Sequence, residues 1–149
     1  MAVKPIPDGF HTVTPYLVVT GVSKLIDFLK QAFGAEEFHR SSRPDGSIMH
    51  AQVKIGDSMV MMGEAMGEFK AMPAMIYLYV NDTDALYQRA LQAGATSVMP
   101  PTDMFYGDRN AGVKDLCGNQ WWIATHKEDI SNEELAKRAE AAAKQQRRG

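Results

Sequence analysis

The sequence predicts an α+β fold in which two βαβββ repeats form a cupped mixed sheet, with a helical tail at the C-terminus. An internal repeat is the first observation behind this prediction: PYLVVTGVSKLIDFLKQAFGA, from Pro15, returns as IYLYVNDTDALYQRALQAGA, from Ile76. The second is a further match, between IMHAQVKIGDSMVMM, from Ile48, and NAGVKDLCGNQWWIA, from Asn110. Matches along most of the chain indicate two equivalent supersecondary units.

Each repeat is predicted to begin with a strand and an amphipathic helix that ends at a glycine. One gap aligns Tyr16 with Tyr77 and Gly34 with Gly94. In the first copy, Ser23 is the expected N-cap, and apolar residues recur at helical spacing up to the glycine. These residues are Leu25, Phe28, Leu29, Ala32 and Phe33. In the second copy, Asp82 or Asp84 is expected to cap the helix.

Three further strands are predicted after each helix, with tight turns at Gly56-Asp57 and Gly118-Asn119. One face of each sheet is then covered by its helix, and we expect the two open faces to combine into a cup. Residues 1–127 form the predicted domain, with units at about 12–64 and 74–126 and a Met/Gly-rich linker at 65–73. Residues 128–149 form a tail whose helix starts with a capping box at Ser131.

Composition narrows the function classes. The 149 residues are 45% hydrophobic and 23% charged, which suits a soluble globule with one core. The net charge of −2 offers no basic footprint for nucleic acid and no polybasic membrane anchor. The single cysteine, Cys117, and the absence of an apolar leader favour a cytoplasmic protein. We therefore expect a small organic molecule as partner, and neither nucleic acid nor membrane.

Four strings resemble the vicinal oxygen chelate superfamily, which includes glyoxalase I, extradiol dioxygenases and the fosfomycin and bleomycin resistance proteins. They are HTVTPYLVV, FLKQAFGAEE, RPDGSIMHAQVKIGDS and FYGDRNAGVKDLCGNQWWIATH, and they look like the PhnB-like branch. The resemblance covers roughly residues 12–126. It implies a scaffold that hosts isomerases, transferases, oxygenases and plain binding proteins, and a chain that pairs as a homodimer.

The resemblance also implies where a divalent metal would be held. The family's ligand positions fall on Thr14, Val60, Met75 and Trp122, or on Met61 in place of Val60 if the register shifts by one residue. Valine and tryptophan offer no usable lone pair, methionine is soft and threonine is a weak ligand. No cofactor is therefore predicted, and a divalent metal at a displaced site remains the alternative.

Strand alternation sorts the remaining residues between the two faces. The residues predicted to face the cup are Thr14, Tyr16, His50, Gln52, Val60, Met62, Met75, Tyr77, Tyr79, Gln120 and Trp122. The residues predicted to face the helices are Leu17, Val19, Met49, Ala51, Val53, Ile76, Leu78 and Val80. An open face of aromatic rings, methionines and amides is typical of a pocket for an organic ligand.

The predicted ligand-binding residues are Tyr16, His50, Gln52, Tyr77, Tyr79, Tyr106, Arg109 and Trp122. His50 is the candidate catalyst, and its alternative is a hydrogen-bonded filler. Arg109, in a predicted rim loop, could bind a carboxylate or phosphate group of a ligand through two hydrogen bonds. Its alternative role is a salt bridge with Asp103 or Asp108. Tyr16 and Tyr77 have the alternative role of filling space between the units.

Two functional hypotheses follow. The first is a metal-independent small-molecule-binding protein that sequesters a planar ligand against Trp122. The second is a lyase, isomerase or dioxygenase that uses a non-standard metal site, with His50 or Glu64 as ligands, or metal-free acid/base chemistry at His50. Whether each cup is built within one chain or across two stays open at this point.

Overall fold

The computed structural model describes the backbone of residues 2–148 and confirms the α+β fold of two βαβββ units. Met1, the first residue of the predicted domain, and Gly149, the last residue of the predicted tail, lie outside the described residues. The elements of the first unit are β1 (Tyr16–Val19), α1 (Val22–Phe33), β2 (Glu36–Ser42), β3 (Ile48–Ile55) and β4 (Ser58–Glu64). Those of the second are β5 (Met75–Tyr79), α2 (Thr83–Gln92), β6 (Thr96–Asp103), β7 (Asp108–Lys114) and β8 (Gln120–His126), followed by α3 (Asn132–Arg148).

Each unit builds its own four-stranded sheet. The strand orders are β1-β4-β3-β2 and β5-β8-β7-β6, so the first and last strands of a unit pair in parallel and the others are antiparallel. Tyr16 lies opposite Met61 and Tyr77 lies opposite Trp122. Since Tyr16 and Tyr77 are equivalent in the repeat, Met61 is the counterpart of Trp122. Within the described chain no strand of one sheet pairs with a strand of the other.

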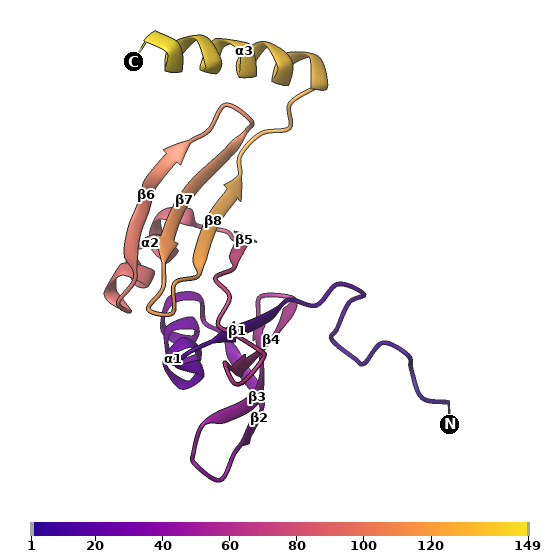
Figure 1. Cartoon of the computed structure of the whole chain (residues 1–149). Helices are drawn as coiled ribbons and strands as arrows, with labels where there is room; N and C mark the ends of the chain where they lie inside the picture. The colour runs from indigo at the N-terminus through magenta and orange to yellow at the C-terminus, as the bar shows by residue number, and fades with distance from the viewer. Residues whose placement is uncertain (1, 149) are drawn as a thin grey trace.

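The two units share one hydrophobic core on their helix-covered faces. Helices α1 and α2 pack against each other, and the ring of Phe33 from α1 lies 5.6 Å from that of Trp121 from β8. Trp121, Ile26 and Leu29 are fully buried in this core. Figure 1 shows both helices on the same side of the two sheets. The opposite, open faces are left without a helix.

The N-terminus of α1 differs from the prediction, whereas that of α2 agrees with it. Helix α1 has Gly21 at its N-cap, in a left-handed conformation with φ of 103° that favours glycine, and no side chain of its own caps it. Instead, the Glu64 carboxylate accepts hydrogen bonds from the amides of Gly21 (2.8 Å) and Val22 (3.0 Å). The prediction for Asp82 is confirmed, since its side chain accepts from the amide of Ala85.

Two predicted face assignments are wrong. Val60 and Met62, predicted to face the cup, are buried in the core on the helix side, and Met61 between them faces outward. Met49, predicted to face the helix, is 51% exposed. For Met49 the reason is a register shift between β2 and β3, in which Ser41 pairs with His50 and Ser42 with Ile48. This irregularity moves the buried side chain from Met49 to Ile48.

The turn between β7 and β8 is organised by a buried carboxylate. Asp115 accepts hydrogen bonds from the amides of Cys117 and Asn119, from the Asn119 side chain and from the Trp121 indole. The side-chain oxygen of Asn119, Oδ1, in turn accepts from the amide of Ala74, just before β5. Burial raises the pKa of the Cys117 thiol to about 11, with a further contribution from Asp115, so it remains protonated. This turn is therefore structural.

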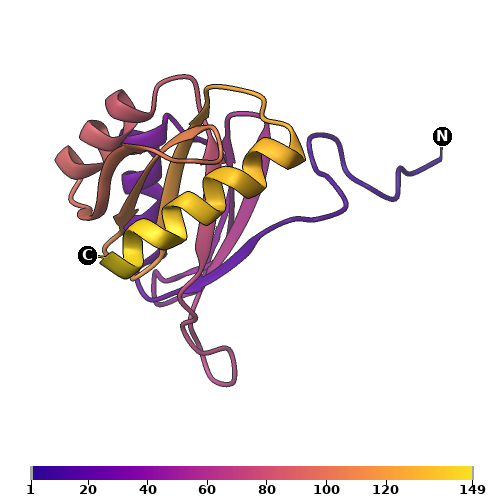
Figure 2. The same ribbon diagram turned by 90° about the horizontal axis from the view of Figure 1, so that it is seen from above.

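Two parts of the chain lie at the periphery: the linker between the two units, and the C-terminal helix α3. In the linker, Met66 and Phe69 form a bridge, and the amide of Met72 donates to the carbonyl of Val18. Ser131 caps α3 as predicted, because its hydroxyl accepts from the amide of Glu134, while the Glu134 carboxylate pairs with Arg138. Figure 2 shows α3 running across the end of the second sheet. Among the described helices, none is long and apolar enough to cross a membrane.

Candidate functional site

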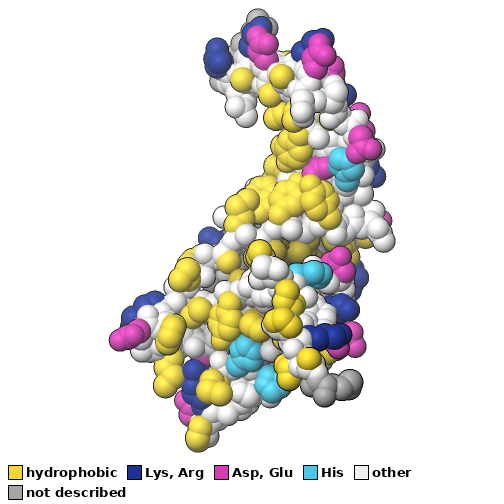
Figure 3. All heavy atoms as spheres, turned by 90° about the vertical axis from the view of Figure 1, so that its right-hand side faces the viewer, with side chains coloured by type: hydrophobic (Ala, Val, Ile, Leu, Met, Phe, Trp, Pro, Cys, Tyr) yellow, Lys and Arg dark blue, Asp and Glu magenta, His cyan; other side chains and the backbone are white. Residues whose placement is uncertain are grey.

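The open faces of the sheets carry an unusual amount of exposed apolar surface. Figure 3, which looks at the side of the molecule away from α1 and α2, shows apolar side chains and histidines gathered on this face. Tyr16 is 49% exposed, Met75 65% and Tyr79 66%. A patch of this kind on a small protein marks a binding surface.

Trp122 lies flat on the open face of the second sheet. Gly112 is its partner across the β7–β8 pair, and a Cβ on Gly112 would come within 2.9 Å of the Trp122 ring. Only glycine therefore lets the indole lie against the strand. In the first sheet, a Cβ on Gly63 would come within 2.7 Å of the backbone oxygen of Met49 and within 2.8 Å of the Tyr16 hydroxyl. Glycine there makes room for the neighbouring strand as well as for the tyrosine.

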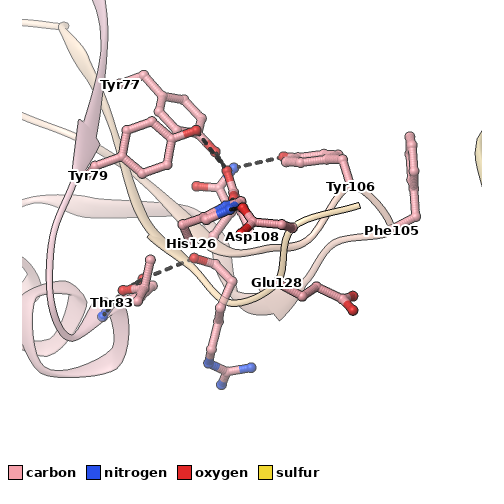
Figure 4. A network of polar contacts seen from close by, with 12 residues as sticks. Tyr77, Tyr79, Thr83, Phe105, Tyr106, Asp108, His126 and Glu128 are labelled. Carbon is pink, nitrogen blue, oxygen red and sulfur yellow. Dashed lines mark hydrogen bonds and ion pairs between the residues drawn. The ribbon is translucent and has the colours of Figure 1, made fainter. Parts of the chain in front are cut away.

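A polar cluster lies beside Trp122 and is centred on Asp108, the first residue of β7. Its Oδ2 accepts hydrogen bonds from the hydroxyls of Tyr77 and Tyr79, both at 3.0 Å, and its Oδ1 accepts from Nδ1 of His126 at 2.9 Å. The other ring nitrogen of His126 lies 2.7 Å from Asp129. Figure 4 shows the two tyrosines of β5 and the histidine of β8 converging on this carboxylate.

The charges in this cluster support one another. Burial alone would raise the pKa of Asp108, but the hydrogen bonds from His126, Tyr77 and Tyr79 outweigh it and lower that pKa. The pKa of Tyr77 is raised, first by burial and then by Asp108, and that of Tyr79 is raised first by its hydrogen bond to Asp108. Asp108 and Asp129 raise the pKa of His126. The face thus presents an ionised carboxylate, two neutral phenols and a histidine that favours its protonated form.

Asn110 extends the cluster towards Trp122. Its amide nitrogen donates to the Tyr106 hydroxyl at 3.2 Å, which confirms that Tyr106 reaches this face from the turn between β6 and β7. Its Oδ1 is buried and has no hydrogen-bond partner among the described residues. Buried amide oxygens without a partner are uncommon.

The open face of the first sheet holds His50 and a hollow. The Gln52 amide donates to Nε2 of His50 at 3.2 Å, which leaves Nδ1 as the donor towards the Tyr16 oxygen at 3.3 Å. Burial, together with the nearby His39, lowers the pKa of His50, in agreement with a neutral ring. Beside them lies a hollow of about 710 Å³ whose walls include Tyr16, Met49, Met66 and Phe69.

Arg109 does not belong to either open face. The rim loop predicted around it is already strand β7, and alternation turns Arg109 towards α2. Its guanidinium pairs with Asp84 (3.0 Å) and Asp103 (3.1 Å). Of the two salt bridges weighed against a ligand clamp, the one with Asp103 is present, and the guanidinium is engaged on the helix side of the sheet.

The positions that the resemblance assigns to metal ligands do not fit a divalent ion. Trp122 and Met75 lie on the open face of the second sheet, Met61 takes the position first assigned to Val60, and the Thr14 hydroxyl donates to the carbonyl of His11. None of the four offers a carboxylate or imidazole. Glu64, the alternative ligand, uses both oxygens to cap α1. The described residues contain no group of three or more His, Cys, Asp or Glu side chains placed to hold a metal.

Sequence reasoning missed Asp108, Asn110 and His126 as functional candidates. A signal for them was present, because Asp108, Asn110 and Gly112 alternate along one strand and leave a polar face. Reading the start of β7 as a loop hid this pattern. The pairing of Asp108 with His126 depends on the β7–β8 register, which local sequence does not reveal.

Known proteins resemble this chain along most of its length. An uncharacterized protein of Mycobacterium bovis is 35% identical over 134 residues, covering 83% of this chain and 88% of its own length. An uncharacterized protein of Mycobacterium tuberculosis is also 35% identical, over 83% of this chain and 79% of its own length.

Solved structures share the fold. TioX from Micromonospora sp. ML1 matches with a TM-score of 0.68 and 26% identity, over 78% of this chain and 98% of its own. A member of the glyoxalase/bleomycin resistance protein/dioxygenase superfamily from Sphaerobacter thermophilus matches with a TM-score of 0.64 and 21% identity, over 77% and 96% of the two chains. The model of that superfamily matches residues 9–123. This chain therefore belongs to the Glyoxalase/Bleomycin resistance protein/Dioxygenase superfamily.

Proposed function

We propose that the protein binds a small organic molecule without a metal ion, in the manner of the PhnB-like and bleomycin resistance members of its superfamily. The observation that carries this proposal is Trp122 lying flat on Gly112, at a position where the family's metal-dependent members place a ligand. An indole there provides a flat apolar surface for a planar ligand. Tyr16, Tyr77 and Tyr79 add further aromatic area on the open faces.

The donor chemistry of the four family positions supports metal independence. Met61, Met75 and Trp122 have no hard oxygen or imidazole nitrogen to offer, and Thr14 is a weak ligand. Elemental analysis of protein purified without a metal-affinity tag, soaked in manganese, iron, nickel or zinc salts and dialysed, is expected to find far less than one ion per chain. One retained ion per chain would overturn this part of the proposal.

We further propose that a second copy of the chain completes each cup. The two sheets of one chain do not pair with each other, and β1 and β5 are edge strands. Both open faces expose apolar side chains, among them Met49 and Tyr79. A two-fold dimer that brings the open face of one sheet opposite the other would cover these surfaces and enclose a ligand.

The binding proposal is tested with the neutral aromatic dye N-phenylnaphthylamine, followed by its fluorescence and by equilibrium dialysis. Wild-type protein is expected to bind it saturably, and Trp122→Ala to weaken binding by about tenfold or more, because the flat apolar surface is lost. Phe38→Ala is the matched control, since Phe38 is also an exposed aromatic residue but lies on β2. Equal affinity of Trp122→Ala and wild type would show that the pocket is assigned wrongly.

A second candidate is metal-free acid/base catalysis by a lyase or isomerase. The observation that favours it is the contact between His126 and the buried Asp108, because a carboxylate at one ring nitrogen orients the imidazole. His50, the candidate from sequence, is hydrogen-bonded to Tyr16 and Gln52 and to no carboxylate among the described residues. For any substrate found by screening, loss of turnover in His126→Gln but not in His50→Gln would support His126 as the catalytic group, with its protonated ring acting as the proton donor. The reverse result would favour His50.

A further inference from the structure

The cluster around Asp108 is rich in hydrogen-bond acceptors. Tyr77 and Tyr79 both direct their hydroxyl protons to Oδ2 of Asp108, so each phenol oxygen has only lone pairs left for another molecule. The carboxylate accepts three hydrogen bonds in all, which is fewer than the roughly four that its lone pairs allow. A molecule that reaches the hydroxyls of Tyr77 and Tyr79 therefore meets acceptors and not donors.

Asn110 provides a second, independent observation at this place. The residue is 3% exposed, and its Oδ1 is a buried acceptor without a partner in the described part of the chain. Asn110 stands on the same face of β7 as Asp108, because Arg109 between them turns to α2. An unmet acceptor beside a buried carboxylate calls for a donor from a bound molecule.

Charge and ring geometry narrow the class of that molecule. Two carboxylates, Asp108 and Asp129, flank the single imidazole of His126. Arg109 and Arg138, the nearby arginines, are engaged with carboxylates elsewhere. The rings of Tyr77 and Tyr79 lie 5.3 Å apart at 59°, and Trp122 lies farther along the same face. Tilted aromatic rings around a carboxylate suit an organic cation.

We propose that this cluster, made of Tyr77, Tyr79, Asp108 and Asn110, binds the protonated amine of an amphipathic aromatic ligand. The ammonium hydrogens are donated to the Asn110 carbonyl oxygen and to the tyrosine oxygens, next to the Asp108 charge. The aromatic part of the ligand lies against Trp122. This inference rests on the proposed binding function and names its ligand class.

The test compares three indoles that carry an ammonium, a hydroxyl or a carboxylate group on the same two-carbon side chain: tryptamine, tryptophol and indolepropionate. Binding to the wild-type protein is measured by isothermal titration calorimetry and by displacement of N-phenylnaphthylamine. Tryptamine is expected to bind about tenfold more tightly than neutral tryptophol, as a charge-assisted hydrogen bond provides, and indolepropionate more weakly than either. Equal binding of tryptamine and tryptophol, or no binding of tryptamine by protein that binds the dye, would overturn the inference.

Variants of Asp108 and Asn110 test whether the preference for tryptamine over tryptophol comes from this cluster. Asp108→Asn keeps a side chain of the same shape without the charge, and Asn110→Leu removes the unpartnered oxygen. Each is expected to lower the affinity for tryptamine while affinity for the neutral dye changes little. Asp103→Asn is the matched control, because it removes one carboxylate from the same sheet at a residue that pairs with Arg109 instead. A tryptamine preference that survives in Asn110→Leu and in folded Asp108→Asn would contradict the inference.

These outcomes are separable from failure of the proposed function. If neither the dye nor any of the three indoles binds, both the binding function and its ligand class are wrong. If the dye binds and loses affinity in Trp122→Ala, but tryptamine gains nothing over tryptophol, only the ligand class is wrong.

Discussion

A single carboxylate illustrates how residue-level electrostatics shape this surface. Asp108 is 4% exposed, and desolvation opposes its ionised form. Three donors from β5 and β8 reverse that effect and lower its pKa. The same contact raises the pKa of His126, because both of its ring nitrogens face carboxylates and are best satisfied when both carry a proton.

The pairing of His126 predicts a pH dependence that NMR can follow. The imidazole of His126 is expected to titrate above the ordinary histidine pKa of about 6.5. In Asp108→Asn that pKa should fall towards the ordinary value, and in Asp129→Asn it should fall as well. Since Asp129 is fully exposed, the second variant is not expected to disturb folding. An unchanged His126 titration in both variants would rule out the ion pairs.

Stability should follow the same titration. The folded-state pKa of His126 is raised, so its contribution to the free energy of unfolding is fully present below about pH 6.5 and is lost as the pH rises through the folded-state pKa. His126→Gln should therefore be less stable than wild type in mildly acidic urea titrations, and the two should converge at alkaline pH. A constant difference across this range would mean that the charge of His126 is irrelevant to folding.

At the scale of elements, each unit uses the last residues of its fourth strand to fasten the start of its own helix. Glu64, at the end of β4, accepts from the amides at the start of α1. Thr125, near the end of β8, accepts from the amide of Thr83 at the start of α2. Because a helix N-terminus leaves amides unpaired and carries a partial positive charge, a carboxylate or hydroxyl there is stabilising. The two repeats solve the same problem with different side chains.

Removing the carboxylate of Glu64 should destabilise the first unit. Glu64→Ala is expected to lower the free energy of unfolding by about 1–2 kcal/mol, the usual effect of losing a helix cap. Glu68→Ala is the control, since it removes the same charge from the linker. Urea denaturation followed by circular dichroism measures both. Equal midpoints for the two variants would mean that the hydrogen bonds to α1 contribute little.

On the scale of the whole molecule, the chain has one covered side and one uncovered side. The shared core lies between the sheets and the two helices, and the open faces expose Tyr16, Met49, Met75 and Tyr79. Helix α3 adds little cover, because it packs extensively against no other element and is held near its start by Arg138, which pairs with Glu128. A second copy is the occupant that we propose for these faces.

Sedimentation equilibrium tests the proposed dimer. The expected mass at micromolar concentration is twice the 16.5 kDa of one chain. Met75→Glu, which places a charge on an exposed position of the edge strand β5, should shift the protein towards the monomer. Val98→Glu, an equally drastic change at an exposed position of β6, should leave the mass unchanged. A wild-type monomer that binds the dye at one molecule per chain would contradict the shared cup.

Local sequence alone determined the repeated βαβββ units, the glycine that ends α1, the Asp82 cap and the Ser131 cap of α3, and it placed Tyr77 and Trp122 on the open face of the second sheet. These features depend on dihedral preferences and on periods of two or 3.6 residues, which a short stretch of chain carries by itself.

Tertiary structure decided that Met61, and not Val60, faces outward from β4. It also decided that Glu64, and not Ser23, caps α1, and that Arg109 points to α2. It also brought Tyr77 and Tyr79 to Asp108, 31 and 29 residues away, and His126 to the same carboxylate across 18. Contacts over such separations are set by strand register, which is fixed only when the helix-covered faces of both sheets pack into one core.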